Sequence, residues 1–362
     1  MRAILFGGGL ALVFSLLGTR VAITQLSSHG YGQEIRDDGP TSHHTKRGTP
    51  TMGGIVIIAS SVLAYFLAKL ITGSTPSASA LLLLFLFVGL GFVGFLDDFI
   101  KIVKQRSLGL RSKAKMIGQT VIAIAFGILA LSPALEDERG KTPASHHISW
   151  IRDFESWTLP TVVVVLLIWL IITGTSNAVN LTDGLDGLAT GACVMVFGAY
   201  TLVNIWQNNQ SCAVAQGPSC YEVRDPLDLA VIAAAIMGAC FGFLWWNASP
   251  AQIFMGDTGS LSLGGALAGL AVLTRTELLL IILGGLFVAV TLSVMLQVSW
   301  FKATRRLTGT GKRVFRMTPI QHHFELLGWE QVTVVIRFWI VTGLCVATGL
   351  GIFYAEWVAG TG

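Results

Sequence analysis

The stretch LLLLFLFVGLGFVGFLDDFIK, residues 81–101, joins a long apolar run directly to two adjacent carboxylates, Asp97 and Asp98. About 20 apolar residues in a helix cross a hydrocarbon core of about 30 Å, so the run predicts a membrane-spanning helix. A charge at the membrane edge is costly unless it is paired, which indicates a cation nearby. Lys101 and Lys104 offer a purely structural pairing one turn onward, whereas metal ligation or general-base work is the functional interpretation.

Composition extends the membrane prediction to the whole chain. The 362 residues are 53% hydrophobic and 12% charged, with a mean hydropathy of +0.69, whereas soluble domains carry about 25% charged residues. Apolar runs recur from end to end, which predicts one integral membrane domain over residues 1–362. The net charge is only +4, and the basic residues cluster in loops without interleaved aromatic residues. This pattern argues against nucleic acid as a partner.

The apolar runs predict an all-α polytopic protein of about ten transmembrane helices. An even number of spans places both termini on one side of the membrane. The expected spans are residues 3–24, 53–72, 78–97, 116–133, 158–176, 187–206, 229–246, 258–273, 278–300 and 333–356.

The loops between these spans differ in positive charge. One alternate set holds fifteen lysines and arginines and the other holds five. Because lysine and arginine favour cytoplasmic loops, we expect both termini outside and the basic loops, with the functional site, at the cytoplasmic face.

Two further acidic segments fall in the basic set of loops. NAVNLTDGLDG, residues 177–187, offers Asn180, Asp183 and Asp186, hard oxygen ligands of the kind that Mg²⁺ prefers together with substrate phosphates. WWNASPAQIFMGDTGS, residues 245–260, supplies Asn247 and Asp257. Asp183 and Asp257 also suit a helix N-cap, so capping is the structural alternative. Capping does not require all three acidic loops to meet at one membrane face, and this convergence favours chemistry.

Two basic segments share that face. SHHTKRGTPTMGG, residues 42–54, contributes Lys46 and Thr51 on a turn that can approach a phosphate, although it lacks the P-loop spacing. KRVFRMTPIQHHFELLGW, residues 312–329, carries His322 and His323, for which hydrogen bonding to phosphate is easier than joint metal ligation. An interfacial loop attracted to anionic lipids is the alternative. Together the segments predict phosphoryl transfer between a diphosphate substrate and a lipid.

Five motifs, in order along nearly the whole chain, resemble the phospho-N-acetylmuramoyl-pentapeptide-transferase (MraY) family. The resemblance implies transfer of phospho-N-acetylmuramoyl-pentapeptide from its UDP-linked precursor to undecaprenyl phosphate, which gives lipid I and UMP in peptidoglycan biosynthesis. It also implies Mg²⁺ dependence, a multi-pass location in the bacterial cell membrane and a possible homodimer. The motifs are KRGTPTMGG (46–54), FLDDFIK (95–101), NAVNLTDGLDGL (177–188), FMGDTGSL (254–261) and MTPIQHHFELLGW (317–329).

The same resemblance assigns site residues. It implies catalytic roles for Asp97, Asp98 and Asp257, with Asp257 and Asp98 as the metal ligands. The positions expected to contact substrate are Lys46, Thr51, Lys101, Lys113, Asn180, Asp183, Asp186, Asn247, Phe254, Gln297, His322 and His323.

The resemblance leaves the chemical mechanism open. Asp97 is expected to deprotonate the lipid phosphate for direct attack, and the competing route makes an aspartate the nucleophile of a covalent phospho-sugar intermediate. The family commonly shows three consecutive histidines, and the first is Gln321 here. Because Gln cannot become cationic, we predict that His322 or His323 carries the essential contact.

Two other functions and one disulfide stay open at this point. A related transferase moves N-acetylhexosamine phosphate from a UDP-sugar to polyprenyl phosphate, and a transporter would also need intramembrane carboxylates. The transporter predicts acidic groups near the bilayer midplane, whereas these cluster at one boundary. Cys212 and Cys220 share one loop of the acidic set, where a disulfide and two free thiols are both compatible with the sequence.

Overall fold

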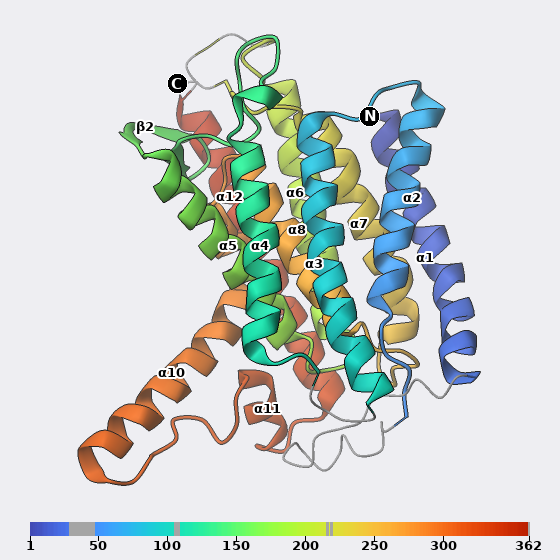
Figure 1. Ribbon diagram of the computed structural model, residues 1–362, viewed down its shortest axis with the longest axis vertical. Coiled ribbons are helices and arrows are strands. Elements are labelled where there is room, and N and C mark those ends of the chain that lie inside the picture. The colour runs from blue at the N-terminus through green and yellow to red at the C-terminus, as the bar shows by residue number, and fades with distance from the viewer. Residues whose placement is uncertain (29–47, 105–108, 215–216, 218–219, 361–362) are drawn as a thin grey trace.

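The computed structural model describes residues 1–28, 48–104, 109–214, 217 and 220–360. These residues form a bundle of long helices with a small two-stranded sheet at one end (Figure 1). The elements are α1 (Arg2–Ser28), α2 (Gly54–Thr72), α3 (Ala78–Val103), α4 (Ser112–Ala130), a 3-10 turn (Pro133–Leu135), β1 (His147–Ser149), β2 (Asp153–Thr158), α5 (Thr161–Thr182), α6 (Leu188–Asn209), α7 (Pro226–Asn247), α8 (Gly256–Leu273), α9 (Leu279–Leu283), α10 (Gly285–Thr308), α11 (Ile320–Glu325) and α12 (Gln331–Gly360).

The membrane-spanning character predicted from the sequence is confirmed. Within the described ranges, nine helices are long and apolar enough to cross a membrane. The expected span at 258–273 is present as α8, which is not one of the nine, and it is buried from Thr258 to Leu273. The expected span at 278–300 is divided at Gly284 into α9 and α10. The chain therefore follows the predicted order of spans, with one helix broken.

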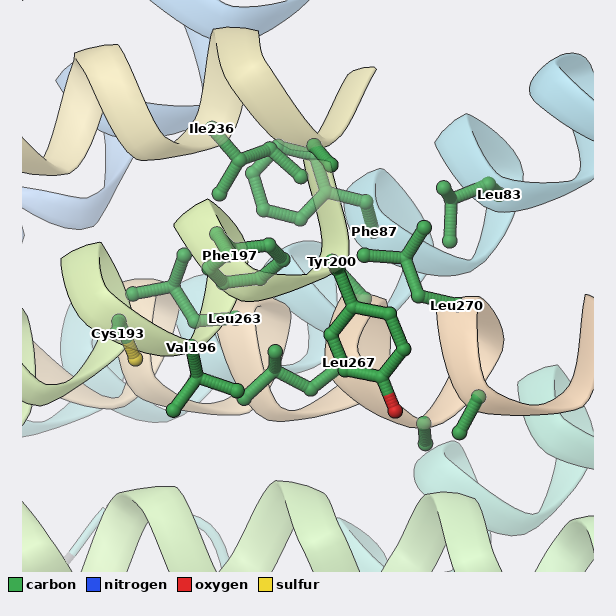
Figure 2. Packing of buried hydrophobic residues seen from close by; sticks show 14 of the residues in the cluster. Leu83, Phe87, Cys193, Val196, Phe197, Tyr200, Ile236, Leu263, Leu267 and Leu270 are labelled. Atoms are coloured by element: carbon green, nitrogen blue, oxygen red, sulfur yellow. The ribbon is translucent and has the colours of Figure 1, made fainter. Parts of the chain in front are cut away.

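Helix α8 lies at the centre of the bundle and contacts α3, α5 and α2. Large side chains of α3, α6, α7 and α8 fill the space around it, among them Phe87, Phe197 and Leu267 (Figure 2). At its first turn α8 approaches α3 so closely that a Cβ on Gly94 would overlap the backbone carbonyl of Asp257. Glycine is therefore required at this contact, which brings the end of α3 against the beginning of α8.

The two ends of the bundle differ. The N- and C-termini lie at the same end, while the last part of α10 and the short α11 lie at the opposite end (Figure 1). The first part of α10 packs against α5 and α12, and its later part runs outward, away from the other helices. The common end of the termini agrees with an even number of crossings.

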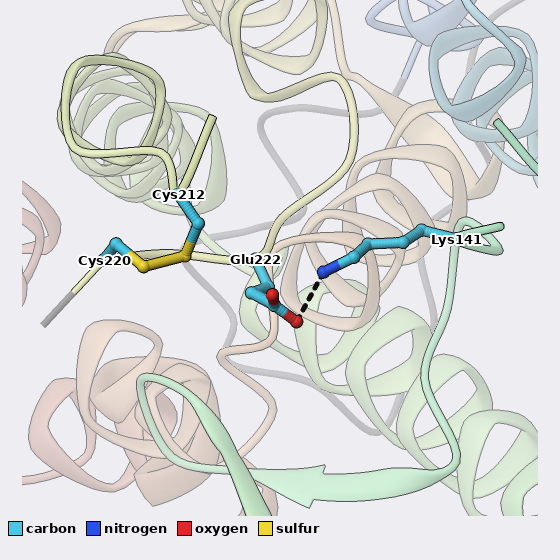
Figure 3. The surroundings of a disulfide bond; sticks show 4 residues. All are labelled: Lys141, Cys212, Cys220 and Glu222. Atoms are coloured by element: carbon cyan, nitrogen blue, oxygen red, sulfur yellow. Dashed lines mark ion pairs between the residues drawn. A yellow bond between two sulfur atoms is a disulfide. The ribbon is translucent and has the colours of Figure 1, made fainter. Parts of the chain in front are cut away.

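The loops at the end that holds the termini are more structured than solvated connectors. Strands β1 and β2 pair antiparallel, a small exception to the all-α prediction. Cys212 and Cys220 form a disulfide, and the neighbouring Glu222 makes an ion pair with Lys141 of the preceding loop (Figure 3). The disulfide that the sequence left open is thus present. The disulfide thus closes the loop between α6 and α7, and the ion pair links this loop to the one that precedes β1.

Candidate active site

Three carboxylates meet at the end of the bundle opposite the termini. Asp97 and Asp98 come from the last turns of α3, and Asp257 comes from the first turn of α8. One oxygen of each lies within 4.8 Å of the others. Asp97 and Asp98 are only 3% and 2% exposed. The convergence of acidic loops that the sequence predicted is present for these residues, and their chemistry fits a divalent cation because Mg²⁺ prefers carboxylate oxygens.

Asp98 joins α3 to the start of α8. Its Oδ2 accepts hydrogen bonds from the Thr258 backbone N–H at 2.9 Å and from the Thr258 hydroxyl at 2.7 Å. Its Oδ1 accepts from the Asp257 backbone N–H at 3.2 Å. A carboxylate at a helix N-terminus satisfies unpaired N–H groups and interacts favourably with the helix dipole. Asp98 therefore caps α8 from another helix and holds Asp257 in place.

Two lysines contact the carboxylates and offset part of their charge. Lys101 Nζ lies 2.6 Å from Asp97 Oδ2, 3.4 Å from Asp98 Oδ1 and 2.9 Å from Asp257 Oδ2. Lys115 Nζ, from the first turn of α4, lies 2.8 Å from Asp257 Oδ2. The cation expected beside the α3 pair is thus Lys101. Because Lys101 also contacts Asp257, this pairing is part of the three-carboxylate cluster. It is therefore compatible with a functional role for Asp97 and Asp98.

Lys115 is a site residue that the sequence did not single out. Lys113, which was singled out, is exposed. Residues two positions apart on a helix, such as Lys113 and Lys115, point about 200° apart, so only one of these lysines can face the carboxylates. The rotation of the helix over 112–130 about its axis, relative to α8, decides that Lys115 is the lysine that faces the carboxylates. The sequence of a basic loop does not give this rotation.

The last turn of α5 completes one wall. The Asn180 side-chain amide donates to Asp257 Oδ1 at 2.6 Å and to the Ser260 hydroxyl at 2.8 Å. Asp183 follows at the C-cap. Burial, and secondarily the carboxylates of Asp257, Asp98 and Asp186, raises the pKa of Asp183 to about 8. Asn180 thus belongs to the cluster, and Asp183 lies close enough for the negative charge of the cluster to raise its pKa.

Other predicted residues hold neighbouring loops together. Asp186 Oδ2 accepts from the Ala251 N–H at 3.2 Å. The buried Asn247 accepts from the Thr190 hydroxyl at 2.8 Å and donates to the Ile253 carbonyl at 2.9 Å. These contacts shape the turn that leads into α8.

The segment that precedes α2 lies against the same turn. The Phe254 N–H donates to the Pro50 carbonyl at 2.8 Å, and the Gly53 N–H donates to the Phe254 carbonyl at 2.9 Å. A Cβ on Gly256 would come within 3.0 Å of the Thr51 hydroxyl and would collide with Asp98 Oδ2, so Thr51 borders the carboxylates. Lys46 lies outside the described residues.

The histidine segment packs on the 183–187 turn. Gln321 is buried and donates to the Leu181 carbonyl at 2.9 Å. His322 Nδ1 and Glu325 Oε2 are 2.7 Å apart, and a Cβ on Gly184 would lie 2.9 Å from His322 Nε2. His322 Nε2 therefore points toward the turn that carries Asp183.

His323 and Gln297 have different surroundings. His323 Nδ1 accepts from the Arg316 backbone N–H at 3.1 Å. The Gln297 side-chain oxygen accepts from the N–H groups of Val314 and Phe315 at 2.9 and 3.0 Å. Gln297 thus binds the backbone of the loop that follows α10. This loop is far in the sequence from the acidic segments.

Comparison with known proteins finds two family models and many full-length relatives. Residues 79–275 match the model of glycosyl transferase family 4, and residues 46–58 match phospho-N-acetylmuramoyl-pentapeptide-transferase signature 1. A protein of Nocardioides sp. named phospho-N-acetylmuramoyl-pentapeptide-transferase is 79% identical, with 99% of this chain and 100% of the relative covered. Proteins of the same name from Streptomyces avermitilis and Cutibacterium acnes are 61% and 62% identical, each over 99% of this chain and 99% and 100% of the relative.

Proposed function

Since the chain belongs to the phospho-N-acetylmuramoyl-pentapeptide-transferase family, we propose how its own residues carry out the family's reaction. The protein is a multi-pass membrane transferase of peptidoglycan synthesis that joins phospho-N-acetylmuramoyl-pentapeptide, from a UDP-linked precursor, to a polyprenyl phosphate, giving lipid I. We take the lipid to be undecaprenyl phosphate and the released nucleotide to be UMP. The single observation that carries the assignment of the site is the buried cluster of Asp97, Asp98 and Asp257.

We propose that Asp257 and Asp98 hold Mg²⁺. Their oxygens lie with that of Asp97 within 4.8 Å, and hard oxygen ligands suit this ion. When bound, Mg²⁺ neutralises the diphosphate and orients it for displacement. Lys101 and Lys115 supply positive charge at the same place, which supports a site built for a polyanionic substrate.

Asp97 is the proposed general base. The Leu110 N–H donates to its Oδ1 at 2.7 Å, and Lys101 contacts its Oδ2. In the direct route, Asp97 takes the proton of the lipid phosphate, and the freed oxygen attacks the phosphorus that bears the sugar. A new P–O bond forms there as the bond from that phosphorus to the oxygen of UMP breaks, and UMP leaves with the electron pair.

The competing route uses an aspartate as nucleophile and forms a covalent phospho-sugar enzyme before the lipid arrives. Incubation with the UDP-linked substrate alone distinguishes the two. A phospho-sugar adduct on the protein, detected by intact mass, would contradict the direct route. Absence of the adduct together with UMP release only after lipid addition is the expected result.

The remaining residues are proposed to form two substrate walls. Asn180, Asp183, Asp186, Asn247 and Phe254 form the nucleotide-side wall. Contacts to phosphate and sugar are proposed for Lys46, Thr51, Lys101, Lys113, His322 and His323. Asn247 and Gln297 act by positioning loops, since their amides are bonded to neighbouring backbone or side-chain groups.

The proposed orientation puts the carboxylate cluster at the cytoplasmic face of the bacterial cell membrane and both termini outside. The basic loops and the position of the cluster at the end opposite the termini support it. A homodimer is compatible with this arrangement. Cysteine labelling from either side of sealed membrane vesicles, at a residue introduced near each end, tests the orientation.

The functional test measures UMP release. UMP release is expected to require Mg²⁺ and added polyprenyl phosphate. The activity of a transporter would not have these two requirements. Comparison of the peptide-bearing UDP-sugar with UDP-N-acetylhexosamine separates this activity from the related sugar-phosphate transferase. The names of the relatives favour the peptide-bearing substrate. Equal turnover of the two donors would contradict the proposal.

A further inference from the structure

The last part of α10 and the loop after it form an arm, defined here as residues 294–316. Helix α10 leaves the bundle in this region (Figure 1). Between residue 294 and its end at Thr308, the helix buries only Thr304, whereas its first half buries Leu286, Phe287, Val290 and Ser293. The described part of the chain therefore offers the arm little packing, and something outside the bundle must surround it.

The arm nevertheless has a fixed internal structure. Gln297 accepts from the N–H groups of Val314 and Phe315 and donates to the Phe315 carbonyl at 3.1 Å. Farther out, the Thr304 hydroxyl accepts from the Lys312 N–H at 2.9 Å. These bonds fasten the returning loop along one face of α10. The arm is thus a hairpin that presents its side chains in set directions.

The arm carries a concentrated positive charge. Residues 294–316 contain no Asp or Glu. Six cations are exposed, and none of them makes an ion pair with a described residue. They are Lys302, Arg305, Arg306, Lys312, Arg313 and Arg316. Such a charge requires counter-ions from outside the described chain.

A second face of the arm is apolar. Met295, Leu296, Trp300 and Leu307 are 58%, 51%, 48% and 85% exposed. At 3.6 residues per turn Leu296, Trp300 and Leu307 fall on one side of the helix, whereas Lys302, Arg305 and Arg306 fall on the roughly opposite side together with Met295. The third side bears Gln297 and Thr304, which bind the loop. An amphipathic helix with separate apolar and basic faces is the pattern of segments that lie in a membrane interface.

We propose that the arm lies in the membrane interface and binds anionic phospholipid headgroups through its six cations, with the apolar face among the acyl chains. Charge complementarity carries the choice of partner, because a leaflet rich in anionic lipid attracts clustered Lys and Arg. The chain on either side of the arm is joined beside the candidate site: the Ile320 N–H donates to the Ser293 hydroxyl at 3.1 Å, and α11 begins at Ile320. Lipid bound to the arm thereby helps to hold α11 and His322 in place.

The test measures lipid binding first and turnover second. Full-length protein is reconstituted in nanodiscs of phosphatidylcholine, or of an equal mixture of phosphatidylcholine and phosphatidylglycerol, and the phosphatidylglycerol retained after detergent washing is quantified by mass spectrometry. One triple variant carries K302Q, R305Q and R306Q. The control triple, R2Q, R139Q and K141Q, removes the same charge at the opposite end of the bundle.

The arm variant is expected to retain roughly tenfold less phosphatidylglycerol than the wild type, and high salt should remove the difference. The control triple should retain the wild-type amount. Turnover of the wild type should rise with phosphatidylglycerol, and turnover of the arm variant should not. Because lipid retention is measured without substrate, its result does not depend on the proposed reaction.

Three results would overturn the inference. Equal retention by the arm variant and the wild type would show that the arm does not bind the lipid. Unchanged retention with a higher KM for the UDP-linked substrate would assign the cations to substrate phosphate. Unchanged retention with loss of an acidic protein partner from membrane extracts would assign the arm to a protein interface.

Discussion

Replacement of Asp257 by asparagine is the sharpest test of the carboxylate cluster. The substitution keeps the side-chain shape and removes the charge that Lys101 and Lys115 contact at 2.9 and 2.8 Å. The three carboxylates and two lysines change from a formal charge of −1 to zero. A divalent ion would therefore meet one fewer negative ligand in the same geometry.

The size of the effect follows from Coulomb's law. Two unit charges about 4 Å apart interact by about 4 kcal/mol at an effective dielectric constant of about 20, and a divalent ion doubles this. If desolvation offsets about half, the lost carboxylate weakens Mg²⁺ binding by about 4 kcal/mol, or roughly 1,000-fold. Turnover at subsaturating Mg²⁺ should fall by at least the same factor.

The assay titrates Mg²⁺ and follows both UMP release and the thermal unfolding midpoint. Asp228→Asn is the matched control, because Asp228 on α7 is also a buried carboxylate. Lys69 Nζ lies 2.9 Å from this carboxylate, and the Tyr65 hydroxyl donates to it at 3.0 Å. It should lower stability, by about 3 kcal/mol for a broken buried pair, and keep the wild-type Mg²⁺ midpoint. A D257N variant with the wild-type Mg²⁺ midpoint and turnover would refute the assignment of Asp257 as a ligand.

Three more outcomes are expected. The double variant His322→Ala, His323→Ala should lose roughly 100-fold or more in turnover, with His322→Ala accounting for most of it because its Nε2 faces the Asp183 turn; normal turnover of the double variant would contradict any essential role. Lys115→Met should lower kcat roughly tenfold, and a change in KM alone would assign Lys115 to substrate binding instead. In the loop after α8, burial raises the pKa of Glu277 from 4.5 to about 8, so the folded protein binds the extra proton. The free energy of unfolding should then fall as pH rises from 4.5 through 8, Glu277→Gln should flatten that decline, and thermal unfolding series with superimposable pH profiles for the two proteins would contradict the shift.

The sequence predicted much of the site because its charges interrupt apolar runs. Asp97 and Asp98 end such a run and Asp257 begins one, so counting spans places all three at one membrane face. Their meeting in space is then a matter of how α8 packs on α3, which the structure supplies through the contact at Gly94.

Other features could not be read from the sequence for physical reasons. Lys115 and Lys113 sit in one basic loop, and only the phase of α4 decides which of them reaches Asp257. Asn247 looks like an oxygen ligand in the sequence, yet its amide bonds Thr190 and Ile253, a choice that depends on tertiary neighbours. No proline marks the break between α9 and α10 at Gly284 in the sequence.

The placement of Lys101 and Lys115 has a consequence for the life of the protein in the cell. Three carboxylates this close would repel one another without a metal, and the two ammonium groups are placed to act as counter-ions. We therefore expect the chain to fold without the proposed Mg²⁺ and to bind it afterwards. Inhibition by a chelator should accordingly be reversible, with activity restored on adding Mg²⁺ back rather than by renewed synthesis.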